Sequence, residues 1–225
     1  AVKNWHYSEN VPKSKLVKFG VWEDDAFIGA VIYGSGANSG LVAPYGLDQT
    51  EGCELVRVAL RQHTVSVSQV VAESLRQLKR TQRGLRLVVS FADPDQGHRG
   101  GIYQAGNWLY LGMTTVADEY IVNGRRVHGR ALRNSRSNHR LRNIESANVE
   151  EWARRVLDPN IEKVSGSSKH RYVYPLDKQM RRYLIPLAQS YPHAVEVSTV
   201  RRLNPVQEVQ VQPLSTAPIL DNADG

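Results

Sequence analysis

The chain has 225 residues and a mass of 25.3 kDa, a length that predicts one domain with an appendage. Hydrophobic residues make up 41% and charged residues 23%, which excludes a wholly disordered chain and a collagen-like repeat. No apolar run reaches the roughly 18 residues of a membrane-spanning helix, and the first residues lack the pattern of a signal peptide. The single cysteine, Cys53, excludes an internal disulfide and predicts a reducing cytoplasm as the compartment. Because the chain starts at Ala1 and not at Met, we expect some N-terminal sequence to have been removed.

Positive charge is concentrated in one stretch of the sequence. The chain has 29 Lys and Arg against 22 Asp and Glu, a net charge of +7. Residues 1–120 hold 12 groups of each sign, and residues 183–225 hold 2 basic and 4 acidic groups. Residues 121–182 hold 15 basic groups, mostly Arg, and 6 acidic groups. Because the guanidinium group matches phosphate oxygens, this stretch predicts contact with a polyanion, with a solvated surface as the alternative.

Strand-like and helix-like segments alternate in the first 120 residues. Strands are predicted at Leu16–Glu23 and Ala26–Tyr33, and Gly29 marks a bulge or a close backbone approach. After a Gly-, Ser- and Asn-rich loop, the predicted elements are a buried strand at Glu54–Leu60, a helix at Val67–Lys79 capped by Ser66 or Ser68, a strand at Leu85–Phe91, a short helix at Gly101–Ala105, and strands at Trp108–Gly112 and Glu119–Val122. This order predicts an α/β fold, a mixed central sheet flanked by helices.

The remainder of the chain is less regular in its pattern. Arg130–Arg142 is polar and rich in arginine, which is typical of a loop or an irregular arm. Helices are predicted at Val149–Leu157 and Lys178–Leu187, and a strand at His170–Tyr174. The segment after His193 shows no period and is interrupted by prolines, which is typical of a flexible tail. The predicted organisation is a catalytic core at 1–120, a basic part of the same domain at 121–192, and the tail at 193–225.

The first candidate cluster lies near the start of the chain, in the sequence NWHYS. Trp5 and Tyr7 can stack on a nucleic-acid base, and His6 can act as a general base or a metal ligand. A buried aromatic pair with a hydrogen-bonded histidine is the alternative interpretation.

The second candidate pair is Glu54 and Arg57, three residues apart in an apolar strand. Because side chains alternate along a strand, the pair is predicted to point to opposite faces. An unpaired charge inside a sheet is costly, so at least one of the two should face a cleft or a buried partner. A catalytic role and a structural salt bridge both fit this pattern.

The third candidate cluster, SFADPDQGH, follows a predicted strand end, where ligands collect in open α/β sheets. Ser90 lies in the strand, and Asp93, Asp95 and His98 offer oxygen and imidazole donors after it, so this cluster could hold one divalent metal such as iron. His6, Asp93 and His98 are the candidate metal ligands. Ordinary turn chemistry, in which Asp caps and Gly takes a positive φ, is the alternative.

The fourth cluster is the most specific of the four, because Tyr103, Trp108 and Tyr110 surround the junction of a short helix and a strand. Its sequence YQAGNWLYLG resembles the late helix-to-strand segment Y-x-x-x-G-F-x-x-x-G of the GNAT acyltransferase fold. The resemblance implies that Tyr103 acts as a general acid. ELVRVAL falls at the position of the central strand of that fold, and Val67–Lys79 at the position of its cofactor helix.

In the GNAT fold the cofactor helix opens with R/Q-x-x-G-x-G/A, whose amides hold a pyrophosphate. Here the stretch reads RQHTVS, so Arg61, Thr64 and Ser66 are the candidate cofactor-binding residues. Both glycine positions are replaced, which argues against ordinary binding of acetyl-CoA and leaves the donor of the transferred group open.

A second resemblance covers most of the chain, from Trp5 to Tyr191. The segments NWHYS, ELVRVAL, SFADPDQGHRGGIYQAGNWLY, IVNGRRVHGRAL and KHRYVYPLD resemble the Mom family of phage DNA-modification proteins. This resemblance implies a GNAT-like fold with its first helix truncated here. It also implies conversion of the adenine N6 amine to a methylcarbamoyl-type adduct, which shields phage DNA from restriction in the cytoplasm of the bacterial host.

The residues are compatible with such chemistry on double-stranded DNA. Phosphate contacts are expected from the arginines of the basic stretch, namely Arg125, Arg126, Arg130, Arg133, Arg136 and Arg140. An extruded adenine is expected to stack on Trp5, Tyr7, Trp108 or Tyr110. Ser90 is a candidate to stabilise developing charge, and His6 or Asp93 to remove a proton. An N-acetyltransferase acting on a protein or small amine, and a DNA-binding accessory protein without catalysis, are the alternatives.

Overall fold

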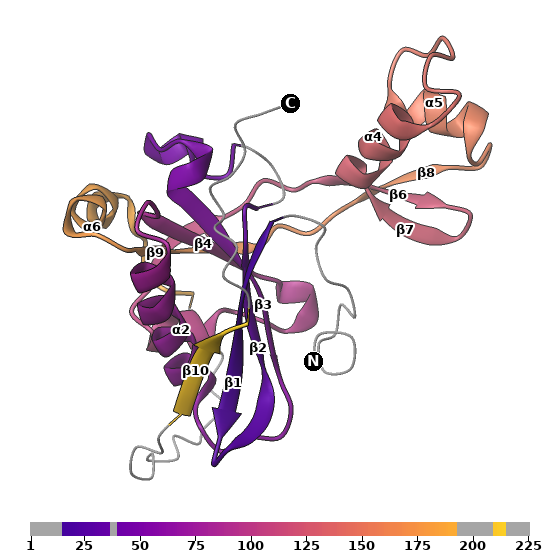
Figure 1. The fold of residues 1–225 in the computed structure, drawn as a ribbon. Coiled ribbons are helices and arrows are strands. Elements are labelled where there is room, and N and C mark those ends of the chain that lie inside the picture. Colours follow the sequence, from indigo (N-terminus) through magenta and orange to yellow (C-terminus); the bar gives the residue numbers. More distant parts are fainter. Residues whose placement is uncertain (1–14, 37–39, 193–208, 215–225) are drawn as a thin grey trace. The chain divides into compact units, whose positions relative to one another are not determined.

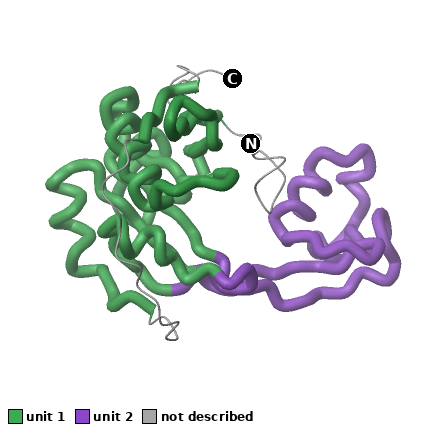
Figure 2. Tube along the Cα trace, turned by 90° about the horizontal axis from the view of Figure 1, so that it is seen from below, with its two compact units in different colours: residues 1–92, 98–112, 170–225 green, residues 93–97, 113–169 purple. Residues whose placement is uncertain are grey.

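The computed structural model describes residues 15–36, 40–192 and 209–214 (Figure 1). It divides the chain into two compact units (Figure 2). The first unit comprises residues 1–92, 98–112 and 170–225, and the second comprises residues 93–97 and 113–169. Residues 170–192 therefore belong with the first unit, although they were predicted to belong with the basic part at 121–192.

A seven-stranded mixed sheet forms the first unit (Figure 1). Its strand order is β10-β1-β2-β3-β4-β9-β5. The strands are β1 (Leu16–Glu23), β2 (Ala26–Gly34), β3 (Gly52–Leu60), β4 (Leu87–Ala92), β5 (Leu109–Met113), β9 (His170–Pro175) and β10 (Val209–Pro213). The predicted mixed α/β sheet is confirmed, since β3 and β4 pair in parallel and the neighbouring pairs β2–β3 and β4–β9 are antiparallel.

β3 and β4 separate after three residue pairs. Their parallel pairing joins Gly52–Glu54 to Leu87–Val89 and ends there, although both strands continue. Beyond this point β3 remains paired with β2, and β4 remains paired with β9. The sheet therefore opens between β3 and β4 beyond Glu54 and Val89.

Helices pack on both faces of the sheet. α2 (Val67–Thr81) and α3 (Gly101–Ala105) contribute to a hydrophobic cluster that contains Val88 of β4. α6 (Lys178–Leu184) contributes to a second cluster that contains Leu87 and Val89. Because successive strand residues point to opposite faces, the two clusters lie on opposite sides of β4. The described residues also form the short 3-10 helices η1 (Ala43–Tyr45), η2 (Gln49–Glu51), η3 (Pro94–Gln96) and η4 (Ile185–Leu187).

The predicted cap and close backbone approach are both present. The Ser66 side chain accepts a hydrogen bond from the Gln69 amide and begins α2, as predicted. Gly29 lies against β3, where an added Cβ would be 2.1 Å from the Ala59 carbonyl oxygen. Only a residue without a side chain fits this position.

The second unit has its own three-stranded sheet and its own core. β6 (Asp118–Val122) lies between β7 (Arg125–His128) and β8 (Glu162–Ser165), with antiparallel pairing on both sides. The turn between β6 and β7 has Asn123 and Gly124 at positive φ, as a tight hairpin turn requires. α4 (Gly129–Asn138) and α5 (Val149–Val156) pack on this sheet, and the cluster is formed by Tyr120, Val122, Leu132, Trp152, Ala153 and Ile161.

The prediction of an irregular arm at Arg130–Arg142 was wrong, because most of this stretch forms α4. Leu132 anchors the helix in the core with 1% of its surface exposed. The His128 side chain caps its N-terminus by accepting a hydrogen bond from the Arg130 amide at 3.0 Å. A single buried leucine between polar residues gives little hydrophobic periodicity, so the sequence did not show this helix.

Both ends of the inserted unit are held together where it leaves the first. The Thr114 amide donates to the Lys169 carbonyl oxygen at 2.8 Å, and the Lys169 amide donates to Thr114 Oγ1 at 2.9 Å. The chain enters the insertion from β5 and leaves it into β9, and these strands are neighbours in the seven-stranded sheet.

Part of the predicted tail forms an edge strand. Val209–Pro213 is β10, which pairs antiparallel with β1 and buries Val211 opposite Val21. Residues 193–208 and 215–225 lie outside the described residues. Across the described ranges, every helix is too short or too polar to cross a membrane.

Candidate active site

Two hydroxyl groups meet where β3 and β4 separate. The Ser90 hydroxyl makes hydrogen bonds with the Leu55 carbonyl oxygen at 3.0 Å and with the Tyr103 hydroxyl at 2.8 Å. A serine hydroxyl has one hydrogen, so Tyr103 can donate to Ser90 when Ser90 donates to Leu55. Ser90 is 1% exposed and Tyr103 is 8% exposed. The structure thus brings together two of the predicted catalytic residues, on the face of the sheet covered by α2 and α3.

A bulge in β3 lies beside this pair. The register with β2 changes so that Tyr33 pairs with Leu55 and Ile32 pairs with Arg57, which leaves Val56 as the extra residue. Gly34 pairs with Glu54, and Gly34 and Ile32 lie on one face of β2. Glu54 and Arg57 therefore share a face, and the prediction that they point to opposite faces was wrong because the bulge resets the alternation.

The face that Glu54 and Arg57 share is not the face of Ser90 and Tyr103. Leu55 belongs to the hydrophobic cluster that contains Tyr103, whereas Ile32, the pairing partner of Arg57, packs with Ala59 in a separate small cluster. The Arg57 guanidinium donates to the Val56 carbonyl oxygen at 2.7 Å, across the bulge. The predicted catalytic residues of the first unit are thus divided between the two sides of the sheet.

A row of aromatic rings extends from Tyr103 across β9 to β5. The Tyr103 ring lies 5.0 Å from the Tyr172 ring, and Tyr172 lies 5.1 Å from Tyr110. The Tyr172 hydroxyl donates to the Arg99 carbonyl oxygen at 2.6 Å. The row needs a glycine at position 100, since an added Cβ would lie 2.2 Å from the Tyr172 ring.

His170 stands at the end of this row and was missed as a site residue. Its Nδ1 lies 3.0 Å from the Tyr110 hydroxyl, and the two rings are 5.7 Å apart. Burial and the nearby Arg99 lower the pKa of His170, which favours a neutral imidazole at neutral pH. The sequence carries a signal for this residue only in the segment KHRYVYPLD, which gives no indication of its pairing with Tyr110.

Two of the four aromatic residues predicted to stack on a base are buried. Trp108 is fully buried between the rings of Tyr103 and Tyr174, and Tyr110 is 7% exposed. Neither presents an open ring face, so we do not place an extruded adenine against them. Trp5 and Tyr7, with His6, lie outside the described residues.

The loop before α2 binds the side-chain carboxylate of Glu23. Glu23 accepts hydrogen bonds from the Val65 amide at 2.7 Å, from the Thr64 hydroxyl at 2.7 Å and from the Thr64 amide at 3.1 Å. Burial raises the pKa of Glu23, but these hydrogen bonds outweigh it and leave the pKa lowered.

This loop also contains the three predicted cofactor-binding residues. Thr64 binds Glu23, and Ser66 caps α2 through Gln69. Arg61 is exposed at the end of β3. A carboxylate on the amides of Thr64 and Val65 repels a phosphate there, so this loop does not fit the pyrophosphate of acetyl-CoA.

The third sequence cluster forms a turn in the structure. The Asp93 side chain accepts a hydrogen bond from the Asp95 amide at 3.1 Å, and Gly97 ends η3 with a φ of 71°. Lys169 Nζ lies 2.9 Å from the other oxygen of Asp93. The turn chemistry that the sequence offered as an alternative is therefore present.

Metal binding through His6, Asp93 and His98 stays a prediction. Within residues 15–36, 40–192 and 209–214, no three His, Cys, Asp or Glu side chains are grouped as metal ligands. His98 is exposed, and His6 lies outside these ranges.

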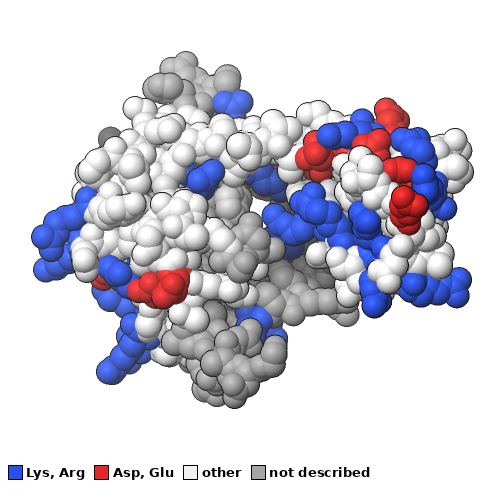
Figure 3. All heavy atoms as spheres, turned by 90° about the horizontal axis from the view of Figure 1, so that it is seen from above, with Lys and Arg blue, Asp and Glu red and all other residues white. Residues whose placement is uncertain are grey.

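The predicted DNA-binding arginines all lie in the second unit, where Lys and Arg side chains gather (Figure 3). Residues 125–142 contain seven arginines and no Asp or Glu. Arg126 is paired with Glu119 and donates to the Ser165 carbonyl oxygen. Within the described part of the chain, no side-chain hydrogen bond or ion pair engages the guanidinium groups of the other six, Arg125, Arg130, Arg133, Arg136, Arg140 and Arg142.

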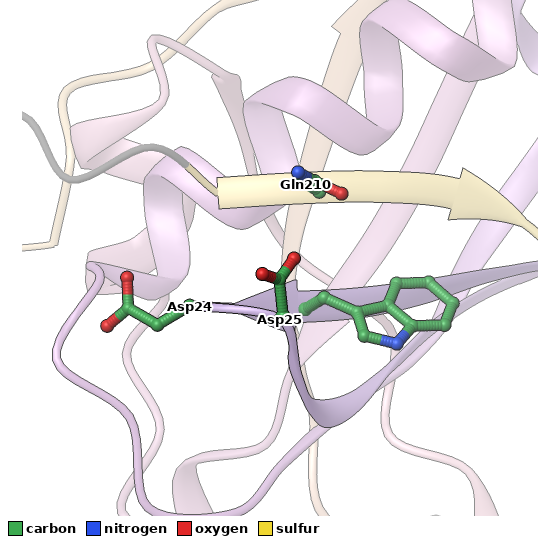
Figure 4. Close-up of a pocket in the computed structure, with 4 residues that line it drawn as sticks. Asp24, Asp25 and Gln210 are labelled. Carbon is green, nitrogen blue, oxygen red and sulfur yellow. The ribbon is translucent and has the colours of Figure 1, made fainter.

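A pocket lies at the hairpin turn between β1 and β2, away from all predicted site residues. It is lined by Trp22, Asp24, Asp25 and Gln210 (Figure 4). Both aspartates adopt positive φ values, which the tight turn requires. The pocket offers carboxylate, amide and indole groups, and none of the predicted site residues lines it.

The fold and site define the chain as a mixed α/β protein that carries a buried hydroxyl pair at an opened parallel strand pair and an inserted arginine-rich unit. The model of the Mom protein family matches residues 1–193. The chain belongs to this family, which is associated with DNA modification in phages. No curated protein sequence matches the chain.

Proposed function

We propose that the protein converts the N6 amine of adenine in double-stranded DNA to a methylcarbamoyl-type adduct and thereby protects phage DNA from restriction in the host cytoplasm. Membership of the Mom family supports DNA as the substrate. The observation that carries the catalytic part of the proposal is the contact between Ser90 and Tyr103 at the open end of the β3–β4 pair.

The substrate sets two chemical requirements. The adenine amine lies inside the duplex, so the base must be extruded at a cost of a few kcal/mol. The amine is neutral, but its lone pair is delocalised into the ring and it attacks an electrophilic carbon poorly. The enzyme must therefore stabilise negative charge that develops on the electrophile and remove a proton from the attacking nitrogen.

The hydroxyl pair can meet the first requirement. Tyr103 and Ser90 are held at 2.8 Å in a buried environment, where a hydrogen-bond donor stabilises charge more strongly than in water. In this proposal Tyr103 donates its proton to the departing group of the methylcarbamoyl donor, and the Ser90 hydroxyl donates to the Tyr103 oxygen and stabilises the negative charge that develops there. His6 or Asp93 is assigned to proton removal from the amine, as the sequence analysis predicted.

The second unit is assigned to holding the DNA. Six arginines without protein partners among the described residues can each bind a phosphate, and each such contact makes binding weaker as salt rises. Phosphate contacts also offset the cost of base extrusion.

Mass spectrometry of nucleosides tests the proposal. The chain is expressed in a bacterial host, plasmid DNA is digested, and modified deoxyadenosine is measured beside an empty-vector control. We expect a deoxyadenosine species with the added mass of a methylcarbamoyl group. If the host accumulates folded protein and its DNA yields unmodified deoxyadenosine alone, the proposal fails.

A further inference from the structure

α4 (Gly129–Asn138) presents a polar face on the side opposite to its buried anchor, Leu132. Residues separated by three, four and seven positions lie on one face of a helix. In α4 this set comprises Arg130, Arg133, Asn134 and Ser137. Arg133, Asn134 and Ser137 are exposed, whereas Leu132 is 1% exposed.

Three of the four side chains on this face make no hydrogen bond or ion pair with the described residues, whereas the Ser137 hydroxyl donates to the Arg133 carbonyl oxygen. Within the described residues, no hydrogen bond or ion pair engages the guanidinium groups of Arg130 and Arg133 or the side-chain amide of Asn134. The hydrogen bond that Asn138 makes to residue 134 goes to its backbone carbonyl oxygen. The arginines of the neighbouring helix α5 differ, because Arg154 pairs with Glu150 and Arg155 pairs with Glu151.

The flanks of α4 carry further arginines whose guanidinium groups have no partner among the described residues. Arg125 lies in β7 before the helix, and Arg140 and Arg142 follow its C-terminal end. Because residues 125–142 contain no carboxylate, no acidic group within this stretch weakens attraction to a phosphate backbone.

The side chains on the outer face of α4 are of the types that recognise base pairs by hydrogen bonds. Arginine hydrogen-bonds the O6 and N7 atoms of guanine, and asparagine hydrogen-bonds N6 and N7 of adenine. The major groove of B-form DNA is wide enough for an α-helix, and the ten residues of α4 span about 15 Å. Asn134 places an amide that matches adenine on the same face as two arginines that match guanine.

We infer that α4 enters the major groove of double-stranded DNA, where Arg130, Arg133 and Asn134 contact base edges while Arg125, Arg140 and Arg142 bind phosphates. This inference rests on the proposed function for its substrate, since DNA is the molecule to be modified. It adds that the choice of DNA sequence resides on the inserted unit, whereas the hydroxyl pair resides on the first unit.

Selection from a random duplex library tests the inference without requiring catalysis. The full chain is incubated with random-sequence duplex DNA, and the bound fraction is sequenced for the wild type and for Arg133→Ala and Asn134→Ala. We expect the wild type to enrich a short motif and each variant to lose preference at one or two positions, roughly tenfold per position. Arg125→Ala should weaken binding to all sequences and reduce its salt dependence while keeping the motif.

Two variants in the same unit serve as matched controls, Ser135→Ala on another side of α4 and Arg154→Ala on α5. Both should keep the motif, with folding of all variants checked by circular dichroism. The inference is overturned if the wild type enriches no motif, if Arg133→Ala and Asn134→Ala keep the full motif, or if single-stranded DNA or RNA binds more tightly than duplex. A chain that enriches a motif but leaves deoxyadenosine unmodified would contradict the proposed reaction and still support groove binding by α4.

Discussion

The hydroxyl of Tyr103 lies 2.8 Å from that of Ser90, one residue beyond the last parallel pair of β3 and β4. At this position the backbone pairing stops, and the Ser90 side chain takes its place by bonding the Leu55 carbonyl. The regular hydrogen-bond pattern of the sheet is therefore interrupted at two neighbouring points, at the end of the β3–β4 pair and at the bulge at Val56.

Tyr103→Phe is expected to reduce formation of modified deoxyadenosine by about a hundredfold or more, which is the range that a general acid contributes. Loss of one buried hydrogen bond should lower the free energy of unfolding by only about 1 kcal/mol. Nucleoside mass spectrometry measures the first effect and urea denaturation the second.

Tyr33→Phe is the matched control for this substitution. Tyr33 is also buried, and its hydroxyl lies 2.7 Å from a serine, Ser74 of α2. This variant should lose similar stability and keep the wild-type rate. A Tyr103→Phe protein that modifies DNA as fast as the wild type would remove Tyr103 from the mechanism.

Gly100→Ala should damage the site while Gly101→Ala leaves it intact. Gly100 has a φ of +82°, and an added Cβ would lie 2.2 Å from the Tyr172 ring, which packs on Tyr103. We expect a loss of about 2 kcal/mol or more together with reduced activity. Gly101 has no atom within 4 Å of such a Cβ, and alanine there should be neutral or stabilising by up to about 1 kcal/mol. Equal melting temperatures for the two variants would contradict the described packing.

Glu23→Gln should destabilise the loop before α2. The Glu23 carboxylate accepts hydrogen bonds from Thr64 and Val65, and hydrogen bonds to a charged group contribute about 1.5–3 kcal/mol. Because these hydrogen bonds lower the pKa of Glu23 below 4.5, its contribution is complete above about pH 4.5 and is lost as the pH falls through the folded-state value. Urea denaturation at a series of pH values measures this dependence.

In Glu23→Gln the acid-dependent part of the stability should be smaller than in the wild type. Glu73→Gln is the control, since Glu73 pairs with Arg76 and accepts a hydrogen bond from Gln77 on the surface of α2, and its loss should cost about 0.5 kcal/mol or less. An unchanged acid dependence in Glu23→Gln would show that another carboxylate dominates.

His128 should make α4 sensitive to mildly acidic pH. Its Nδ1 must be unprotonated to accept the hydrogen bond from the Arg130 amide. Burial lowers the pKa of His128, and the charges of Arg130, Lys169 and Arg133 act in the same direction, while Glu119 opposes them. Since the folded-state pKa lies below 6.5, the stabilising effect of the cap is complete above about pH 6.5 and is lost as the pH falls through the folded-state value.

His128→Ala is expected to cost about 1 kcal/mol at neutral pH, the usual effect of losing an N-cap. His128→Asn keeps an acceptor that does not titrate and should unfold with less dependence on pH between 5 and 7. Thermal unfolding followed by circular dichroism measures both variants. If His128→Asn shows the same pH dependence as the wild type, another histidine is responsible.

Local pattern was sufficient to predict much of the first unit. The bounds of β1 and α3 match the prediction, and α2 begins at the predicted residue after the Ser66 cap, because periodic apolar residues and caps act over a few neighbours. Strands β7, β8 and β10 were missed because they are short or lie at sheet edges, where few buried residues mark them.

The sequence predicted several residues of the site but not their positions relative to one another. The bulge at Val56 exists only in the register with β2, so alternation along β3 alone placed Glu54 and Arg57 on opposite faces. The contact between Ser90 and Leu55 depends on the parallel pairing of β3 with β4, whose residues are 35 positions apart. The pairing of His170 with Tyr110 spans 60 positions and has no local signal at all.

The two hydrogen bonds between Thr114 and Lys169 mark the place at which the inserted unit can be deleted. Two strands that already run side by side need only a short turn to join them, so a shortened gene that closes this gap retains every strand of the larger sheet. The inserted unit can in this sense be deleted, and another unit with a different DNA sequence preference can be inserted at the same junction.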